Sequence, residues 1–187
     1  MASTFKNYIA AARLRTLPLS VSGILAGSAI GNEKGLFNWL IFAFALLTTI
    51  CFQVLSNFAN DYGDGVKGTD ANRKGEARMV ASGAISAENM KMAVWAFSVL
   101  SALFSSLTLF SAFGSAYYLY YLVFIGLAAL AIISAIKYTV GKSAYGYKGL
   151  GDIFVFVFFG LVAVVGSCFL YTKNISKDVW LPAITIG

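Results

Sequence analysis

The chain alternates between long apolar runs and short polar segments. The apolar runs cover residues 17–30, 39–58, 92–113, 117–136 and 153–172. A helix needs about 20 mostly apolar residues to span a bilayer; four runs have that length, and the first reaches it if its helix starts near Tyr8. A sixth run, from Val179 to the last residue, would rise only about 13 Å as a helix, less than half of the hydrocarbon core. This pattern predicts an all-α integral membrane helix bundle with five complete spans and part of a sixth.

Composition argues against a soluble globular domain. Hydrophobic residues make up 59% of the 187 residues and charged residues make up 12%. Ordinary soluble domains contain about 25% charged residues, and a soluble core of this size could not bury five such runs. We therefore expect a multi-pass protein whose direct partner is the lipid bilayer.

Basic residues are distributed unevenly between the polar segments. The N-terminal segment and the segments after the second and fourth runs hold all but three of the 14 lysines and arginines; the others are Lys34, Lys173 and Lys177. Because basic residues accumulate in cytoplasmic loops, this predicts an inner (cytoplasmic) membrane protein whose N-terminus and two longest loops face the cytoplasm. Topology and anionic lipid account for the net charge of +6, so we expect no nucleic-acid partner.

Two of the apolar runs have a distinctive composition. Gly23 and Gly27 in the first run form a small-xxx-small pair, which is typical of closely packed membrane helices. The fifth run contains the phenylalanine-rich stretch "IFVFVFFG". This stretch either lines a groove for an apolar substrate or is ordinary packing and lipid-facing surface, and the general dominance of apolar residues in spans favours the second interpretation.

The residue inventory limits the possible chemistry. The chain has no histidine, which excludes histidine metal sites, histidine acid–base catalysis and Ser-His triads. Cys51 and Cys168 both fall inside predicted spans, where we interpret them as small buried hydrophobic residues. A metal would have to be held by oxygen atoms, which favours a hard cation such as Mg²⁺.

The stretch "NFANDYGDGVKGTD", residues 57–70, places carboxylates at the cytoplasmic end of the second run. If the helix continues to about residue 62, a step of about 100° per residue puts Asn57, Asp61 and Asp64 on one face. We expect the two glycines that flank Asp64 to loosen the backbone, so that Asp64 lies just past the last regular turn. Clustered carboxylates repel one another, and a divalent cation would relieve that repulsion.

Basic residues follow the aspartates directly, at Lys67, Arg73, Lys74 and Arg78. Acidic and basic groups at one mouth fit a metal-bridged diphosphate, in which aspartates hold Mg²⁺ while lysine and arginine contact phosphate oxygens. The alternative is a solvated loop of mixed charge. We disfavour it because carboxylates within or beside membrane spans are rare and usually functional.

Three stretches, in order, carry a family resemblance. They are "ARLRTLPLSVSGILAGSAIG" (residues 12–31), "NFANDYGDGVKGTD" (residues 57–70) and "KYTVGKSAYGYKGLGDIFVFVFFGLVAVVGS" (residues 137–167). Together they resemble the UbiA superfamily of membrane prenyltransferases, most closely its menaquinone branch. The resemblance implies a helix bundle with a lateral opening to lipid. It also implies Mg²⁺-dependent transfer of a polyprenyl group from an allylic polyprenyl diphosphate to 1,4-dihydroxy-2-naphthoate, with loss of CO₂, giving demethylmenaquinone.

The resemblance further implies roles for individual residues. Asn57, Asp61 and Asp64 match the catalytic metal–diphosphate site. The implied substrate-binding residues are Arg15, Asn60, Lys67, Asp70, Arg78, Lys137, Tyr138, Tyr145 and Tyr147. Of these, Lys67 and Arg78 would hold diphosphate, and Arg15 would face the cavity. The tyrosines either shield an allylic cation with their π faces or anchor the protein at the membrane interface, and the sequence favours neither.

The family's second aspartate-rich motif has no counterpart in this chain, where Asp152 and Asp178 are isolated. We therefore expect residues 1–187 to be a single transmembrane prenyltransferase domain, truncated at its C-terminus. The alternatives are transfer to another aromatic acceptor such as 4-hydroxybenzoate or homogentisate, a lipid-alcohol phosphotransferase, a prenyl-diphosphate-binding protein without turnover, and an ion-coupled transporter. A transporter is disfavoured because the acidic cluster lies at a helix end and not at the membrane midplane.

Overall fold

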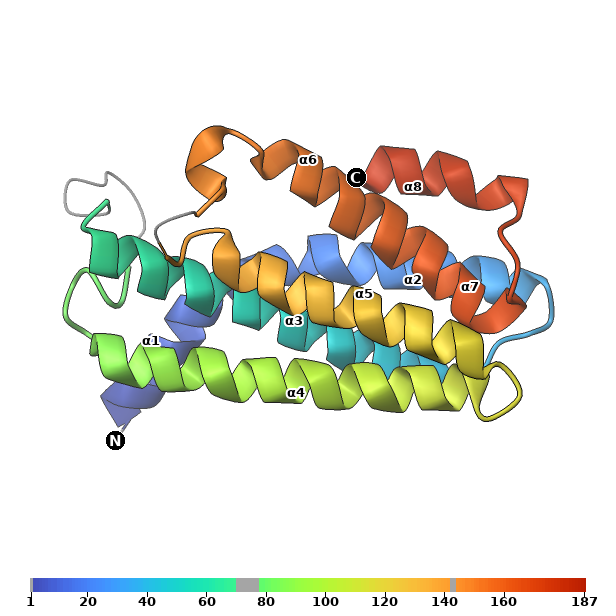
Figure 1. The fold of residues 1–187 in the computed structure, drawn as a ribbon, viewed down its shortest axis with the longest axis horizontal. Coiled ribbons are helices and arrows are strands. Elements are labelled where there is room, and N and C mark those ends of the chain that lie inside the picture. Colours follow the sequence, from blue (N-terminus) through green and yellow to red (C-terminus); the bar gives the residue numbers. More distant parts are fainter. Residues whose placement is uncertain (1, 70–77, 142–143) are drawn as a thin grey trace.

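Long helices run side by side along the molecule in the computed structural model, which describes residues 2–69, 78–141 and 144–187 (Figure 1). Five helical stretches are long and apolar enough to cross a membrane: Phe5–Glu33, Trp39–Lys67, Ala87–Phe113, Tyr118–Lys137 and Gly151–Thr172. The sixth apolar run forms the short helix α8 (Trp180–Ile186). No strand occurs in the described ranges. The predictions of an all-α membrane bundle and of five spans are confirmed, and the sixth apolar run is helical.

The first span is interrupted near its start. Helix α1 (Ala2–Ala12) and helix α2 (Leu17–Glu33) flank a short 3-10 turn, η1 (Leu14–Thr16). Arg13 adopts a φ of 49°, in the left-handed region that residues with a side chain rarely occupy. The helix that we expected to enter the first span near Tyr8 is therefore a separate element, packed beside α3.

The second span, α3 (Trp39–Lys67), continues through both glycines that flank Asp64. The expectation that Gly63 and Gly65 loosen the backbone, with Asp64 past the last turn, is wrong. A Cβ at Gly63 would lie 2.6 Å from Thr139 Oγ1, and one at Gly65 would lie 2.5 Å from a methyl carbon of Val80. The glycines instead permit close approach of neighbouring segments to a regular helix.

The remaining spans follow in sequence. Helix α4 (Ala87–Phe113) lies along α3, and α5 (Tyr118–Lys137) packs beside both. The fifth span consists of α6 (Gly151–Val155), a π-helical segment η3 (Phe156–Val165) and α7 (Gly166–Thr172). Short 3-10 turns precede α6 and α8, at η2 (Gly146–Lys148) and η4 (Lys177–Val179). A π-helix of 10 residues is rare, and such segments often mark functional sites.

The connections gather at two ends of the bundle. The described parts of the α3–α4 and α5–α6 connections lie at the left end in Figure 1, with α1, and the α2–α3, α4–α5 and α7–α8 connections lie at the right end. These left-hand segments are the ones rich in lysine and arginine. The fold thus collects the residues predicted to carry chemistry at one end.

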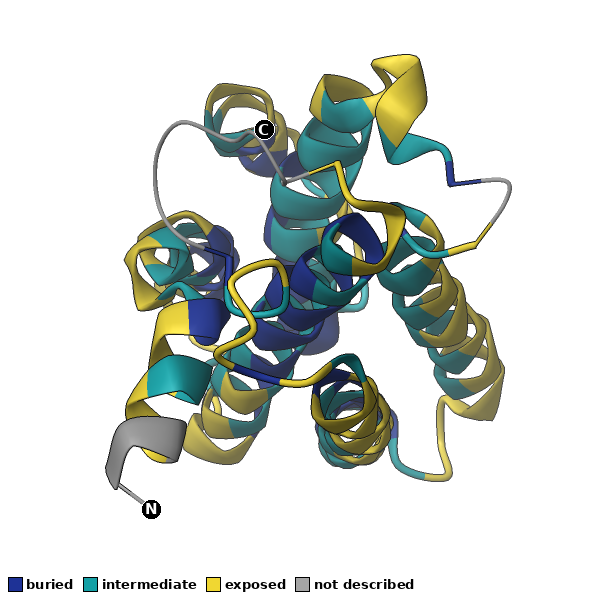
Figure 2. Ribbon diagram, turned by 90° about the vertical axis from the view of Figure 1, so that its left-hand side faces the viewer, coloured by how far each residue is buried: buried dark blue, intermediate teal, exposed yellow. Residues whose placement is uncertain are grey.

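The packing centre lies on α3 and on the crossing of α2 with the fifth span. Viewed along the bundle, buried residues gather at the centre and exposed residues cover the outer helix faces (Figure 2). A Cβ at Gly23 would lie 2.7 Å from Ala163 Cβ, and one at Gly27 would lie 2.6 Å from Ser167 Cβ. The predicted small-residue packing of the first span is confirmed.

Candidate functional site

A cavity of about 470 Å³ lies between α2, α3, α4, α5 and the fifth span. Along α3 its lining extends from Ala45 to Asn60, a rise of about 22 Å. None of the lining residues in the described part of the chain is charged. The cavity therefore runs from the loop-bearing end deep into the apolar bundle.

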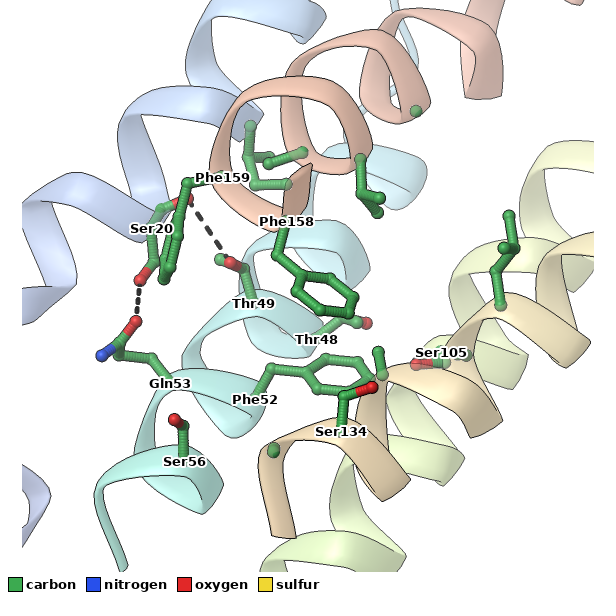
Figure 3. Close-up of a pocket in the computed structure, with 18 of the residues that line it drawn as sticks. Ser20, Thr48, Thr49, Phe52, Gln53, Ser56, Ser105, Ser134, Phe158 and Phe159 are labelled. Carbon is green, nitrogen blue, oxygen red and sulfur yellow. Dashed lines mark hydrogen bonds between the residues drawn. The ribbon is translucent and has the colours of Figure 1, made fainter. Parts of the chain in front are cut away.

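The fifth span contributes the aromatic part of this wall. Phe154, Phe158 and Phe159 all line the cavity, together with Val162. Figure 3 shows the Phe158 ring pointing into it. Part of the phenylalanine-rich stretch is thus cavity wall, whereas Ile153 is exposed. The sequence had favoured packing and lipid-facing surface for the whole stretch.

Asp61 is almost completely buried, with 1% of its surface exposed. Its two carboxylate oxygens accept hydrogen bonds from the backbone N–H groups of Met79 (3.0 Å) and Val80 (2.9 Å). Each oxygen could accept a further hydrogen bond, but each already accepts one from the segment that leads into α4. Asp61 thereby fixes this segment against the end of α3.

Asp64, one turn further along α3, joins both polar loops. Arg78 Nη2 donates to Asp64 Oδ2 at 3.3 Å, and both side chains are largely buried. The Tyr147 hydroxyl donates to Asp64 Oδ1 at 2.5 Å, and Thr69 Oγ1 donates to the same oxygen at 3.3 Å. Lys67 Nζ lies 4.1 Å from the centre of the Tyr147 ring. An acidic centre surrounded by basic and phenolic groups therefore lies at this end of α3.

Asn57 points toward the end of α1 and the η1 turn. Its Nδ2 donates to the Ala12 carbonyl oxygen at 2.8 Å and to Thr16 Oγ1 at 3.1 Å. Since a carbonyl oxygen only accepts, the amide nitrogen must point toward Ala12. Asn57 lines the cavity, and its Oδ1 has no donor within the described ranges, so a carbonyl-type oxygen remains for a ligand.

Three further predicted residues, Asn60, Tyr138 and Tyr145, line the cavity. Asn60 Oδ1 accepts from Thr139 Oγ1 at 3.3 Å. The Tyr145 hydroxyl donates to the Ser134 carbonyl oxygen at 2.8 Å, and its ring stacks on Phe154 with 4.3 Å between centroids. Burial raises the pKa of the Tyr145 phenol above its usual value. These contacts hold the aromatic mouth of the cavity in place.

The other predicted residues lie at the surface of this end or outside the described ranges. Arg15, Lys67 and Lys137 are exposed, and Arg15 is absent from the cavity lining, contrary to the expectation that it faces the cavity. Asp70 falls outside the described residues. The structure thus brings Asp64, Arg78, Lys67 and Tyr147 together and leaves Arg15 outside the cavity.

Oxygen donors for a cation are present, but they are not preassembled. No group of three or more acidic or cysteine side chains close enough to share a metal occurs among the described residues. The cavity-facing Asn57 Oδ1 and the Asp64 carboxylate are hard oxygen donors of the kind that Mg²⁺ prefers. The residues present therefore fit a hard cation that also binds oxygens of a substrate.

The sequence interpretation missed the polar residues on the cavity wall. Ser20 Oγ donates to Gln53 Oε1, and Thr49 Oγ1 donates to the Ser20 carbonyl oxygen at 3.4 Å (Figure 3). Deeper in the cavity, Thr48 and Thr108 form a hydrogen bond of 3.0 Å. Gln53, a polar residue inside an otherwise apolar span, was the signal that could have located this wall.

Comparison with known proteins gives a consistent family. Residues 20–187 match the UbiA prenyltransferase family. The chain is 47% identical over 180 residues to 1,4-dihydroxy-2-naphthoate octaprenyltransferase of Haemophilus influenzae, covering 94% of this chain and 58% of that protein. It is 41% identical over 186 residues to the Escherichia coli protein of the same name, covering 99% of this chain and 60% of that protein.

A more distant relative is the UbiA prenyltransferase domain-containing protein 1 of Dictyostelium discoideum, 26% identical over 163 residues, which are 87% of this chain and 49% of that protein. The chain therefore spans about 60% of the length of the bacterial relatives above. No solved structure matches the chain.

Proposed function

The chain belongs to the UbiA prenyltransferase family, and on this premise we propose that it takes part in transfer of a polyprenyl group from an allylic diphosphate to 1,4-dihydroxy-2-naphthoate. The names of the bacterial relatives support this acceptor. In the proposed reaction, the C1–O bond of the donor breaks with its electron pair on the diphosphate. The ring carbon that carries the carboxylate bonds to C1. The bond between that carbon and the carboxylate then breaks, its electron pair restores the aromatic ring, and CO₂ leaves.

The observation that carries the proposal is the long uncharged cavity beside a charged mouth. An apolar polyprenyl tail fits a long cavity whose surface is mostly apolar and whose lining carries no charge in the described ranges. A diphosphate fits the end of α3, where Arg78 and Lys67 lie beside Asp64. The two ends of an allylic diphosphate thus meet complementary surroundings.

We assign the metal–diphosphate site to Asp64, Asp61 and the Asn57 Oδ1 oxygen. Mg²⁺ bound there would neutralise charge on the leaving diphosphate. Arg78 and Lys67 would contact phosphate oxygens. The Tyr147 hydroxyl, which now bonds to Asp64, would donate to an oxygen of the substrate instead. Tyr138 and Tyr145 present aromatic surface at the mouth, where they could shield an allylic cation.

We also propose that the protein lies in the inner membrane and that this end of the bundle faces the cytoplasm. The concentration of lysine and arginine at this end supports the orientation.

The test is mass spectrometry of lipid extracts. Membranes carrying the chain are incubated with Mg²⁺, a polyprenyl diphosphate and 1,4-dihydroxy-2-naphthoate, with 4-hydroxybenzoate offered in parallel. We expect a product with the prenyl mass added and CO₂ lost, abolished by EDTA and by Asp64→Asn but not by Glu88→Gln, which alters an exposed carboxylate elsewhere. Product from 4-hydroxybenzoate alone would mean a different acceptor.

Because the chain is shorter than its bacterial relatives, the experiment has a second part. If the 187 residues give no product, the chain is extended with the C-terminal part of the Haemophilus influenzae relative and assayed again. Product from the extended chain only would show that these residues form part of the domain. If neither chain gives product with any acceptor, the proposed reaction is wrong.

A further inference from the structure

Gln53 brings a hydrogen-bond donor to the cavity that none of the roles above uses. It lies on α3, one helical turn deeper in the bundle than Asn57, and both side chains line the cavity. Residues four apart on a helix lie on the same face, so Gln53 is next to Asn57 on the wall. Figure 3 shows Gln53 on this wall, with the Phe52 and Phe158 rings also projecting from its lining.

The orientation of the Gln53 amide is dictated by its partners. The Thr16 hydroxyl donates to the Arg13 carbonyl oxygen at 2.9 Å. Because its proton is used there, Thr16 Oγ1 accepts from Gln53 Nε2, also at 2.9 Å. On the other side, Ser20 Oγ donates to Gln53 Oε1. The amide nitrogen therefore faces Thr16 and the oxygen faces Ser20, without ambiguity.

One N–H of this amide remains for a ligand. The amide nitrogen carries two hydrogens, and within the described part of the chain Gln53 Nε2 makes a single hydrogen bond to protein. Its direction is fixed by the bonds to Thr16 and Ser20, so little side-chain freedom is lost when a ligand binds. A neutral, preorganised donor thus lies on a cavity wall that carries no charge in the described ranges.

The chemistry of the substrates decides which part meets this donor. A polyprenyl tail has no oxygen and would leave the N–H unsatisfied, which is costly in an apolar cavity. A diphosphate or a carboxylate would be left without a counter-charge, because no charged residue lines the described cavity wall. A phenolic hydroxyl is neutral, accepts a hydrogen bond and is attached to a flat ring that aromatic walls accommodate.

We propose that Gln53 donates a hydrogen bond to a phenolic hydroxyl of the aromatic acceptor and so orients its ring in the cavity. This inference rests on the proposed function. It makes Gln53 a specificity-determining residue for hydroxylated aromatic acceptors, with Thr16 and Ser20 as positioning residues that hold its amide. The acceptor carboxylate is then directed toward the basic mouth of the cavity.

The test compares ligands with and without hydroxyl groups on variants of the full chain. Binding of 1,4-dihydroxy-2-naphthoate and of 2-naphthoate is measured by calorimetry on purified protein in lipid nanodiscs. We expect Gln53→Met, which keeps side-chain length but removes the donor, to weaken binding of the dihydroxy compound about tenfold. Binding of 2-naphthoate should be unchanged.

Two more variants separate ligand contact from structural support. Gln53→Asn keeps the amide but shortens it, and it should lose the same hydroxyl preference even if Gln53→Met fails to fold. Ser20→Ala removes the bond that holds Gln53 Oε1 but leaves the free N–H, so the preference for the dihydroxy compound should be reduced but not abolished. In the turnover assay, Gln53→Met should raise KM for the naphthoate and leave KM for the prenyl diphosphate unchanged.

Each outcome bears on a distinct claim. The inference is overturned if the Gln53 variants weaken binding of both ligands equally, or if both variants keep the preference for the hydroxylated ligand. In either case the proposed function stands if product is formed. Hydroxyl-dependent binding that requires Gln53, without prenylated product from any chain, overturns the proposed function but supports the hydroxyl site. No binding of the dihydroxy compound to the wild-type protein also overturns the inference.

Discussion

Replacing Asp61 tests whether this carboxylate organises the loop beyond α3 as well as contributing an oxygen to a metal. The carboxylate is 1% exposed and accepts from the backbone N–H groups of Met79 and Val80 at 3.0 and 2.9 Å. In Asp61→Asn one oxygen becomes an NH₂ group, which confronts a backbone N–H with a second donor. One charge-assisted hydrogen bond is lost and the remaining one becomes neutral.

The magnitude follows from these two bonds. A hydrogen bond to a charged group contributes about 1.5–3 kcal/mol, and an unsatisfied buried donor costs about 1–3 kcal/mol. We therefore expect Asp61→Asn to destabilise the packing of this segment against the end of α3 by about 3 kcal/mol. Since every 1.4 kcal/mol is a factor of ten, the amides of Met79 and Val80 should exchange with solvent about 100-fold faster.

The assay is hydrogen–deuterium exchange with mass spectrometry on the peptide that contains both amides. Glu88→Gln serves as the control, because Glu88 is an exposed carboxylate in the first turn of α4. Asp64→Asn should change exchange less, because Asp64 accepts from side chains of the loop and not from these amides. If Asp61→Asn exchanges within twofold of the wild-type protein, the loop does not depend on Asp61 and the reasoning fails.

Three further predictions address the same end of the bundle. Gly63→Ala should lower thermal stability by about 1–3 kcal/mol, because its methyl group meets the neighbouring loop, whereas Gly126→Ala, with open space around it, should not destabilise the protein; thermal unfolding in detergent distinguishes them. Tyr147→Phe removes the 2.5 Å bond to Asp64 and should increase proteolysis of the α5–α6 loop by a few-fold. Burial raises the pKa of Tyr145, so its neutral form favours folding; stability should fall as pH rises through its usual value near 10 and beyond, and Tyr145→Phe should flatten that part of a denaturation profile.

The sequence predicted the spans because their signal is local. Apolar length and the polar segments between runs are sufficient to place five spans, and each observed helical stretch covers its run almost completely, although the first starts earlier and the second ends later than its run. The extension of α3 past residue 62 was missed because glycine was interpreted as a source of flexibility. At Gly63 its small size is needed for Thr139 to approach, and that contact involves residues far apart in the sequence.

The sequence named the candidate site residues but not how they are grouped in space. Periodicity placed Asn57, Asp61 and Asp64 on one helix face, yet their partners come from different segments of the chain. The partners of Asp61 are backbone amides of an irregular loop, and no sequence pattern specifies such contacts. The hydrogen-bonded part of the cavity wall around Gln53 depends on how α2 is rotated against α3. That rotation is set by packing at the small residues of α2.

The two aspartates of the motif differ in how easily their partners can be exchanged. Asp61 satisfies part-buried backbone amides, and those amides would lose their partner if a metal took over both oxygens. Asp64 satisfies the side chains of Arg78 and Tyr147, which can turn to phosphate oxygens when a diphosphate binds. Asp64 is therefore the carboxylate whose contacts can change during a catalytic cycle, and Asp61 is the one that keeps the loop in place while they change. Substitutions at the two positions should accordingly have different effects. Loss of Asp64 should impair diphosphate binding while the loop stays packed on α3, and loss of Asp61 should release the loop from α3.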